Sequence, residues 1–112
     1  MKVCDIIGNI EARIVCGDGE KEFGGVYVGD LLSRAMSRIE CDDLWVTIMS
    51  NVNVIAVATL TEPAAIILAE DVTLDDNEIA KANENFITVL TTKLSAYEVC
   101  SRISKLNSEQ KI

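Results

Sequence analysis

The side chains that could do chemistry in this chain are carboxylates, thiols and hydroxyls, because its 112 residues include no histidine. Without an imidazole, neither a Ser-His-Asp triad nor a Cys-His pair can form. Adjacent acidic residues occur at Asp42-Asp43, Glu70-Asp71 and Asp75-Asp76. Such pairs mostly occupy solvated turns, so they do not indicate acid–base catalysis. We therefore predict no catalytic residues and a protein that is not an enzyme.

The four cysteines, Cys4, Cys16, Cys41 and Cys100, lie far apart and form no C-x-x-C pair. A zinc site would need thiolates from four separate segments to converge, so we predict no metal. Cys16 has apolar neighbours in the sequence, and Cys100 lies on the apolar face of its predicted helix. Both positions are typical of cysteines that act as small buried hydrophobic residues. Reduced thiols indicate a cytoplasmic protein.

The glycine-rich segments do not match a nucleotide-binding motif. Residues 24–30 place Asp30 where a Walker loop needs lysine, and Gly17-Asp18-Gly19 lacks the third glycine of a dinucleotide fingerprint. We therefore predict no cofactor.

The charge balance excludes two classes of partner. The chain carries 18 acidic and 10 basic residues, a net charge of −8. Arg34 and Arg38 share one helix face, but Glu40, Asp42 and Asp43 follow directly. Nucleic acids and anionic membranes require clustered cations, so neither is expected as a partner.

Apolar strands alternate with helices along most of the chain. We expect strands at residues 12–16, 26–28, 44–49, 65–69 and 87–90. We expect helices at 3–10, 30–39, 53–60 and 73–86, a further helix from Ser95, and a frayed tail at 107–112. Segment 53–60 has the β-branched residues of a strand, but an asparagine cap and Pro63 favour a buried helix.

Three helix starts have recognisable caps. Asp30 is expected to cap the helix at 30–39, and Thr73 with Asp76 is expected to begin the helix at 73–86. Ser95 with Glu98 is expected to form a capping box at the start of the last helix. In the helix at 73–86, one face is expected to carry Ile79, Ala82, Asn83 and Phe86.

This alternation predicts an α/β fold with three layers, α/β/α, around a mostly parallel sheet. Ligands of such sheets bind beyond the carboxyl ends of the strands, near helix N-termini. The candidate ligand-binding residues at these ends are Gly29, Asp30, Asn51, Thr91 and Thr92. The alternative is that these residues only cap helices and form turns.

Five blocks in order resemble the DRTGG domain family over residues 3–106. They begin at Gly25-Val-Tyr-Val-Gly-Asp-Leu-Leu-Ser33 and continue through Leu44-Trp-Val-Thr-Ile-Met, Asn53-Val-Ile-Ala-Val-Ala-Thr-Leu, Ala65-Ile-Ile-Leu and Thr91-Thr-Lys-Leu-Ser-Ala-Tyr-Glu98. Of the motif that names the family, Gly24-Gly25 remains, while Glu20 to Phe23 replace the acidic-Arg-Thr part.

The resemblance implies an α/β/α fold and supports a helix at 53–60. Domains of this family occur beside CBS domains and in some phosphate acetyltransferases, and they resemble the N-terminal domain of HPr kinase. The resemblance therefore implies an accessory module that senses a small anionic metabolite or nucleotide, or that docks on a partner enzyme. The alternative is a purely structural homodimerisation domain.

A homodimer is expected in either case. Hydrophobic residues make up 49% of the chain, and mean hydropathy is +0.25, so apolar surface should remain outside a single small core. We expect the helix at 30–39, with Met36, and the apolar segment 52–60 to supply the interface.

Overall fold

A five-stranded sheet forms the centre of the computed structural model, which describes residues 1–110. The strands are β1 (Arg13–Cys16), β2 (Val26–Val28), β3 (Leu44–Thr47), β4 (Ala65–Leu68) and β5 (Val89–Thr91), in the spatial order β1-β5-β4-β3-β2. Strands β2 to β5 run parallel, and β1 joins β5 antiparallel. The expectation of a mostly parallel sheet is confirmed.

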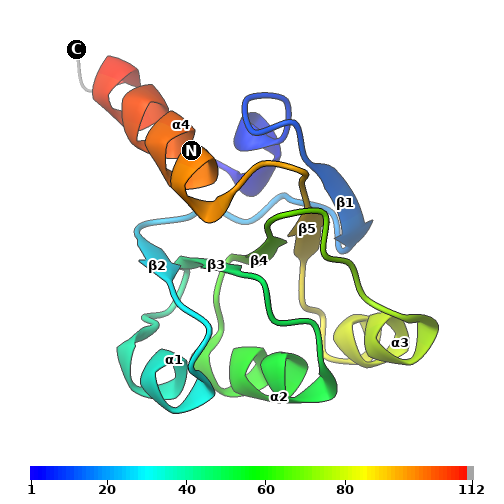
Figure 1. The fold of residues 1–112 in the computed structure, drawn as a ribbon. Coiled ribbons are helices and arrows are strands. Elements are labelled where there is room, and N and C mark those ends of the chain that lie inside the picture. Colours follow the sequence, from blue (N-terminus) through cyan, green and yellow to red (C-terminus); the bar gives the residue numbers. More distant parts are fainter. Residues whose placement is uncertain (111–112) are drawn as a thin grey trace.

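Helices cover both faces of the sheet, so the molecule has three layers (Figure 1). On one face lie α1 (Leu32–Arg38), α2 (Val52–Thr61) and α3 (Asp76–Glu84), packed around the buried Trp45. On the other lie the 3₁₀ helix η1 (Val3–Ile6) and α4 (Ala96–Gln110).

The central strands β3 and β4 are buried along their whole length. Their uninterrupted apolar sequences suit strands that are covered by helices on both faces. Alternate residues point to opposite layers, so Trp45 faces α1 and α2 while Leu44 and Val46 face α4.

The ambiguous segment at 53–60 is a helix, as predicted. Asn51 caps α2, because its side-chain oxygen accepts hydrogen bonds from the backbone N–H of Asn53 at 2.9 Å and of Val54 at 3.2 Å. The helix ends at Glu62, which has left-handed φ and ψ, directly before Pro63. Local capping thus outweighs the β propensity of the valines.

Two helix starts differ from prediction. Asp30 does not cap α1, whose N-cap is Leu31 without a side-chain hydrogen bond. The Asp30 carboxylate binds the end of β3 instead. Helix α3 begins with Asp75 rather than Thr73, and Asp75 forms its capping box with Glu78. Aspartate at the N-cap accepts backbone N–H groups as well as threonine does, so both registers fit the sequence.

The expectation that Phe86 lies on a face of this helix is wrong. Helix α3 ends at Glu84, and Phe86 follows with φ of 57° and 94% of its surface exposed. The helical periodicity that would have placed Phe86 on one face with Ile79 and Ala82 stops two residues earlier.

The two ends of the chain also differ in helix length from the expectations. The helix predicted at 3–10 is a 3₁₀ helix of four residues followed by turns, although Val3, Ile6 and Ile10 are buried. Helix α4 continues to Gln110, where the sequence suggests a frayed tail from residue 107, and residues 111–112 lie outside the described part. Within residues 1–110, no helix combines the length and apolar character needed to cross a membrane.

Candidate functional site

The predicted ligand residues lie at the carboxyl ends of the parallel strands, in two separate places. Gly29 and Asp30 follow β2 and contact the end of β3, since the Gly29 N–H donates to Val46 O at 3.2 Å. Asn51 lies beyond β3 at the start of α2. Thr91 and Thr92 lie at the end of β5, and β4 stands between β5 and β3. The first three residues therefore follow the neighbouring strands β2 and β3, and the threonines follow β5, which does not adjoin β3.

Asp30 and Asn51 use their carboxylate and amide oxygens within the fold. Asp30 Oδ1 accepts from the Thr47 hydroxyl at 2.7 Å and from the Ile48 N–H at 3.0 Å. Asn51 Oδ1 is occupied by the first turn of α2. These bonds hold the loops that follow β2 and β3 in place.

Thr91 and Thr92 are buried, each with 3% of its surface exposed. The Thr91 hydroxyl donates to Val72 O, and the Thr92 hydroxyl donates to Ile10 O at 2.7 Å. Both hydroxyls therefore fasten β5 to neighbouring loops. At this edge of the sheet, the solvent-exposed predicted residue is Asp30.

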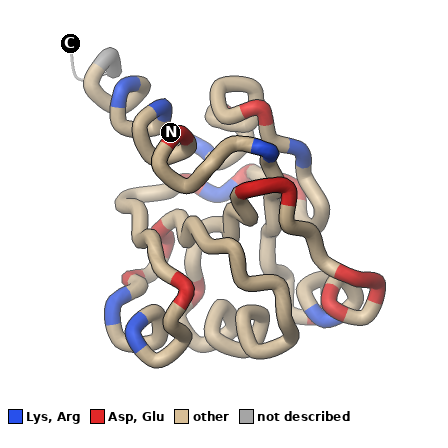
Figure 2. Tube along the Cα trace, in the orientation of Figure 1, with Lys and Arg blue, Asp and Glu red and all other residues tan. Residues whose placement is uncertain are grey.

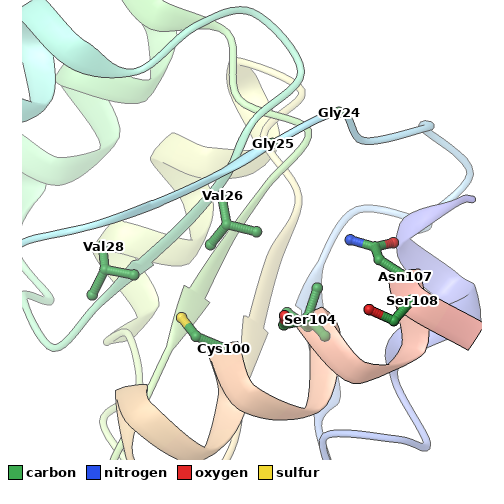
Figure 3. Close-up of a pocket in the computed structure, with 9 residues that line it drawn as sticks. Gly24, Gly25, Val26, Val28, Cys100, Ser104, Asn107 and Ser108 are labelled. Atoms are coloured by element: carbon green, nitrogen blue, oxygen red, sulfur yellow. The ribbon is translucent and has the colours of Figure 1, made fainter.

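A groove with a volume of about 450 Å³ lies between β2 and α4 (Figure 3). The β2 side carries the partly exposed Val26 and Val28, which pair with Leu44 and Val46 in the sheet register and so face α4. The residues that line the groove are Gly24, Gly25, Val26, Val28, Cys100, Ile103, Ser104, Asn107 and Ser108.

The lining of this groove is apolar with a few polar groups. Two valines, Ile103 and the Cys100 thiol form its body, and burial raises the pKa of that thiol above its ordinary value. Hydroxyl and amide groups enter from α4 through Ser104 and Asn107. Ligand pockets commonly combine about 300–1,000 Å³ of mostly apolar space with a few convergent polar groups, and this groove has both.

The two edges of the sheet are protected differently. Edge strand β1 contains the charged Arg13, and its register with β5 shifts between Ile14 and Cys16. A charge and a bulge are devices that prevent an edge from pairing with another strand. Edge strand β2 lies in the uncharged segment 23–29 and pairs in regular register with β3. Edge strand β2, beside the groove, therefore has neither of these two protections against pairing with another strand.

Sequence reasoning missed this groove, because its two walls lie more than 70 residues apart in the chain. The signals that could have indicated it are the retained Gly24-Gly25 pair and the absence of charge from 23 to 29.

The four cysteines are free thiols, with Cys16 buried as expected and Cys100 half-buried. Within residues 1–110, no group of three or more His, Cys, Asp or Glu side chains is placed to hold a metal ion.

These observations define the protein as an α/β/α domain with a mostly parallel sheet, one open sheet edge and a groove beside that edge. A family model for the DRTGG domain matches residues 5–106, and the chain belongs to this family. No curated protein sequence matches the chain.

The fold is similar to a solved regulatory region. That structure contains the CBS and DRTGG domains of the regulatory region of Clostridium perfringens pyrophosphatase, complexed with its activator, diadenosine tetraphosphate. The TM-score is 0.77 at 19% sequence identity, over 90% of this chain and 45% of the other. This chain thus spans less than half of the structure that it resembles, and the likeness establishes the α/β/α fold.

Proposed function

We propose that this protein is a non-catalytic regulatory module that senses a small ligand, an anionic metabolite or a nucleotide, or docks on a partner enzyme. The observation that carries the proposal is the uncharged groove of about 450 Å³ between β2 and α4. Its size and apolar lining suit the neutral part of a small ligand, and its wall of hydroxyl and amide groups can orient that part.

Family membership supports a regulatory role, because the similar pyrophosphatase structure is itself a regulatory region with a bound activator. That activator is a dinucleotide, so nucleotides are the first ligands to test. We infer that any catalysis lies in a partner or in another domain, since the chain has no histidine to activate a nucleophile.

The strand-end residues stay predicted ligand contacts. All five residues bond within the fold, but Gly29 and Asp30 also have exposed surface beside the open edge strand, whereas Thr91 and Thr92 are buried. We also propose a cytoplasmic location, which the widely spaced free thiols support.

A purely structural homodimerisation domain is the second candidate function. Exposed apolar side chains on α1 and α2 favour it, with Met36 44%, Val52 45% and Leu60 69% exposed. A closed pair of chains would cover these side chains, since two-fold dimers are the commonest soluble oligomers.

A thermal-shift screen with adenosine, adenine nucleotides, acyl phosphates and inorganic phosphate tests the groove. Ser104→Trp fills the groove from an exposed helix position, and Ser101→Trp adds the same bulk to α4 at an exposed position outside the lining. A ligand at a hundredfold excess over its dissociation constant stabilises the native state by about 2.7 kcal/mol.

We expect one ligand to raise the melting temperature of the wild type and of Ser101→Trp, but not of Ser104→Trp. Equal shifts in both variants would contradict the groove as the site. No shift with any ligand would favour the structural homodimerisation domain.

A further inference from the structure

Two arginines on α1 lie one helical turn apart, and neither forms an ion pair with an acidic side chain that the structure describes. Arg34 and Arg38 are four residues apart, a spacing at which like charges repel and destabilise a helix. Figure 2 shows these basic positions on α1. Among the described side chains, the ion pairs use Lys2, Lys21 and Arg102, and neither arginine of α1 takes part in one. Arg38 lies in the last turn of α1, where a cation favours the helix dipole, but both guanidinium groups remain available to an anionic ligand.

The same two side chains line a surface hollow of about 360 Å³ together with Tyr27. Tyr27 belongs to β2, pairs with Trp45 in the sheet register and packs half-buried against the core. Its hydroxyl lies close to the backbone of Gly29, where an added Cβ would come within 2.9 Å of the phenol oxygen. Gly29 thus leaves the space in which the phenol ring lies beside the arginines.

We propose that Arg34, Arg38 and Tyr27 form a binding site for the phosphate groups of a small phosphorylated ligand. Guanidinium groups bind phosphate through paired, charge-assisted hydrogen bonds, and two of them match the charge of a phosphate dianion. The Tyr27 hydroxyl adds a neutral donor. The nearby Asp30 is exposed, but its Oδ1 accepts hydrogen bonds from Thr47 and Ile48, which offset part of the negative charge of the carboxylate.

This site lies on the opposite face of the sheet from the groove, because Tyr27 faces α1 and α2 while Val26 and Val28 face α4. The inference rests on the proposed function only in assuming that the module responds to a ligand. The two sites can therefore be tested separately.

Titration calorimetry with ATP, inorganic tripolyphosphate and adenosine distinguishes the site from its alternatives. The variants are Arg34→Gln with Arg38→Gln, and a control of Lys81→Gln with Lys105→Gln that removes the same charge from exposed positions on α3 and α4. A third variant, Arg34→Lys with Arg38→Lys, keeps the charge and removes the planar fork. Circular dichroism melting confirms that each variant folds.

We expect tripolyphosphate and ATP to bind the wild type, and the glutamine pair on α1 to weaken both by about tenfold or more. The control variant should change the affinity for both ligands by less than about twofold. The affinity of the lysine pair should lie between those of the control and the glutamine pair on α1. Tighter binding of ATP than of tripolyphosphate would identify a nucleotide, and equal binding a free polyphosphate. Equal weakening in both glutamine variants, or no tripolyphosphate binding to the wild type, would overturn the site.

Adenosine separates this inference from the proposed function. Adenosine binding that Ser104→Trp abolishes, together with absent tripolyphosphate binding, would leave the groove in place and remove the arginine site. Tripolyphosphate binding that depends on Arg34 and Arg38, without any effect of Ser104→Trp on adenosine or nucleotides, would support the arginine site and contradict the groove.

Discussion

At the scale of single residues, Asp30 shows how one side chain joins two strands. It follows β2, and its carboxylate accepts hydrogen bonds from Thr47 and Ile48 at the end of β3. The Thr47 side chain is buried, so loss of the carboxylate would leave its hydroxyl without this partner.

We expect Asp30→Ala to destabilise the protein by about 1–3 kcal/mol, because a buried donor loses its charged acceptor. Urea unfolding measures the change. Asp76→Ala is the control, since Asp76 lies in the first turn of α3 and should contribute only about 0.3–1 kcal/mol through the helix dipole. Equal losses in the two variants would contradict the bridging role of Asp30.

The thiols of Cys16 and Cys100 should titrate above their ordinary pKa of 9.0, because burial raises both pKa values. The folded state then holds these protons over a pH range in which the unfolded chain has lost them. Stability is therefore complete below about pH 9 and falls as the pH rises through the folded pKa values.

Urea midpoints between pH 7 and 10.5 measure this effect. We expect the decline to be weaker in the variant with Cys16→Ala and Cys100→Ala. The exposed Cys41 serves as the control, and Cys41→Ala should keep the slope of the wild type. A slope that is the same in all three proteins would show that the two thiols do not contribute.

At the scale of elements, α4 combines a local start signal with a long-range contact. The Ser95 hydroxyl accepts from the Glu98 N–H at 3.2 Å and donates to the Glu98 carboxylate at 3.3 Å. The predicted contact between these two residues is confirmed. The apolar side of the helix then packs Val99 and Ile103 onto the sheet.

Ser95→Ala should destabilise the protein by about 1 kcal/mol, because an N–H of the first turn loses its acceptor. Calorimetry should show this as a lower melting temperature. Ser101→Ala on the same helix removes a hydroxyl from an exposed position and should leave the melting temperature nearly unchanged. An unchanged melting temperature for Ser95→Ala would show that the cap does not stabilise α4.

At the scale of the whole molecule, the three layers leave apolar side chains exposed on the face formed by α1 and α2. Leu60 is 69% exposed there, and Met36 lies on the neighbouring helix. Charge repulsion between acidic chains opposes random association, so a defined pairing of these side chains is the arrangement that we predict.

Sedimentation equilibrium at micromolar concentration should give twice the chain mass of 12.2 kDa. Leu60→Glu should yield the monomer, because it places a charge in the predicted interface. Tyr97→Ser removes a side chain from α4 that is more exposed than Leu60, and it should leave the dimer intact. A wild-type mass near 12.2 kDa would rule out the dimer.

The sequence alone determined the features that depend on near neighbours in the chain. The apolar runs at 44–49 and 65–69 predict buried strands, and they contain β3 and β4. Helix α2 begins directly after Asn51 and ends shortly before Pro63, and both residues can be recognised in the sequence. These signals are readable because a cap or a helical repeat acts within about four residues.

Only the tertiary structure decided where distant segments meet. Asp30 is suited to cap a helix, but Thr47 and Ile48 at the end of β3 provide two donors for its carboxylate. The groove joins residues 24–28 to α4, and the hollow beside Tyr27 needs α1 to pack against β2. The order of strands depends on contacts between segments far apart in the chain, which local patterns do not encode.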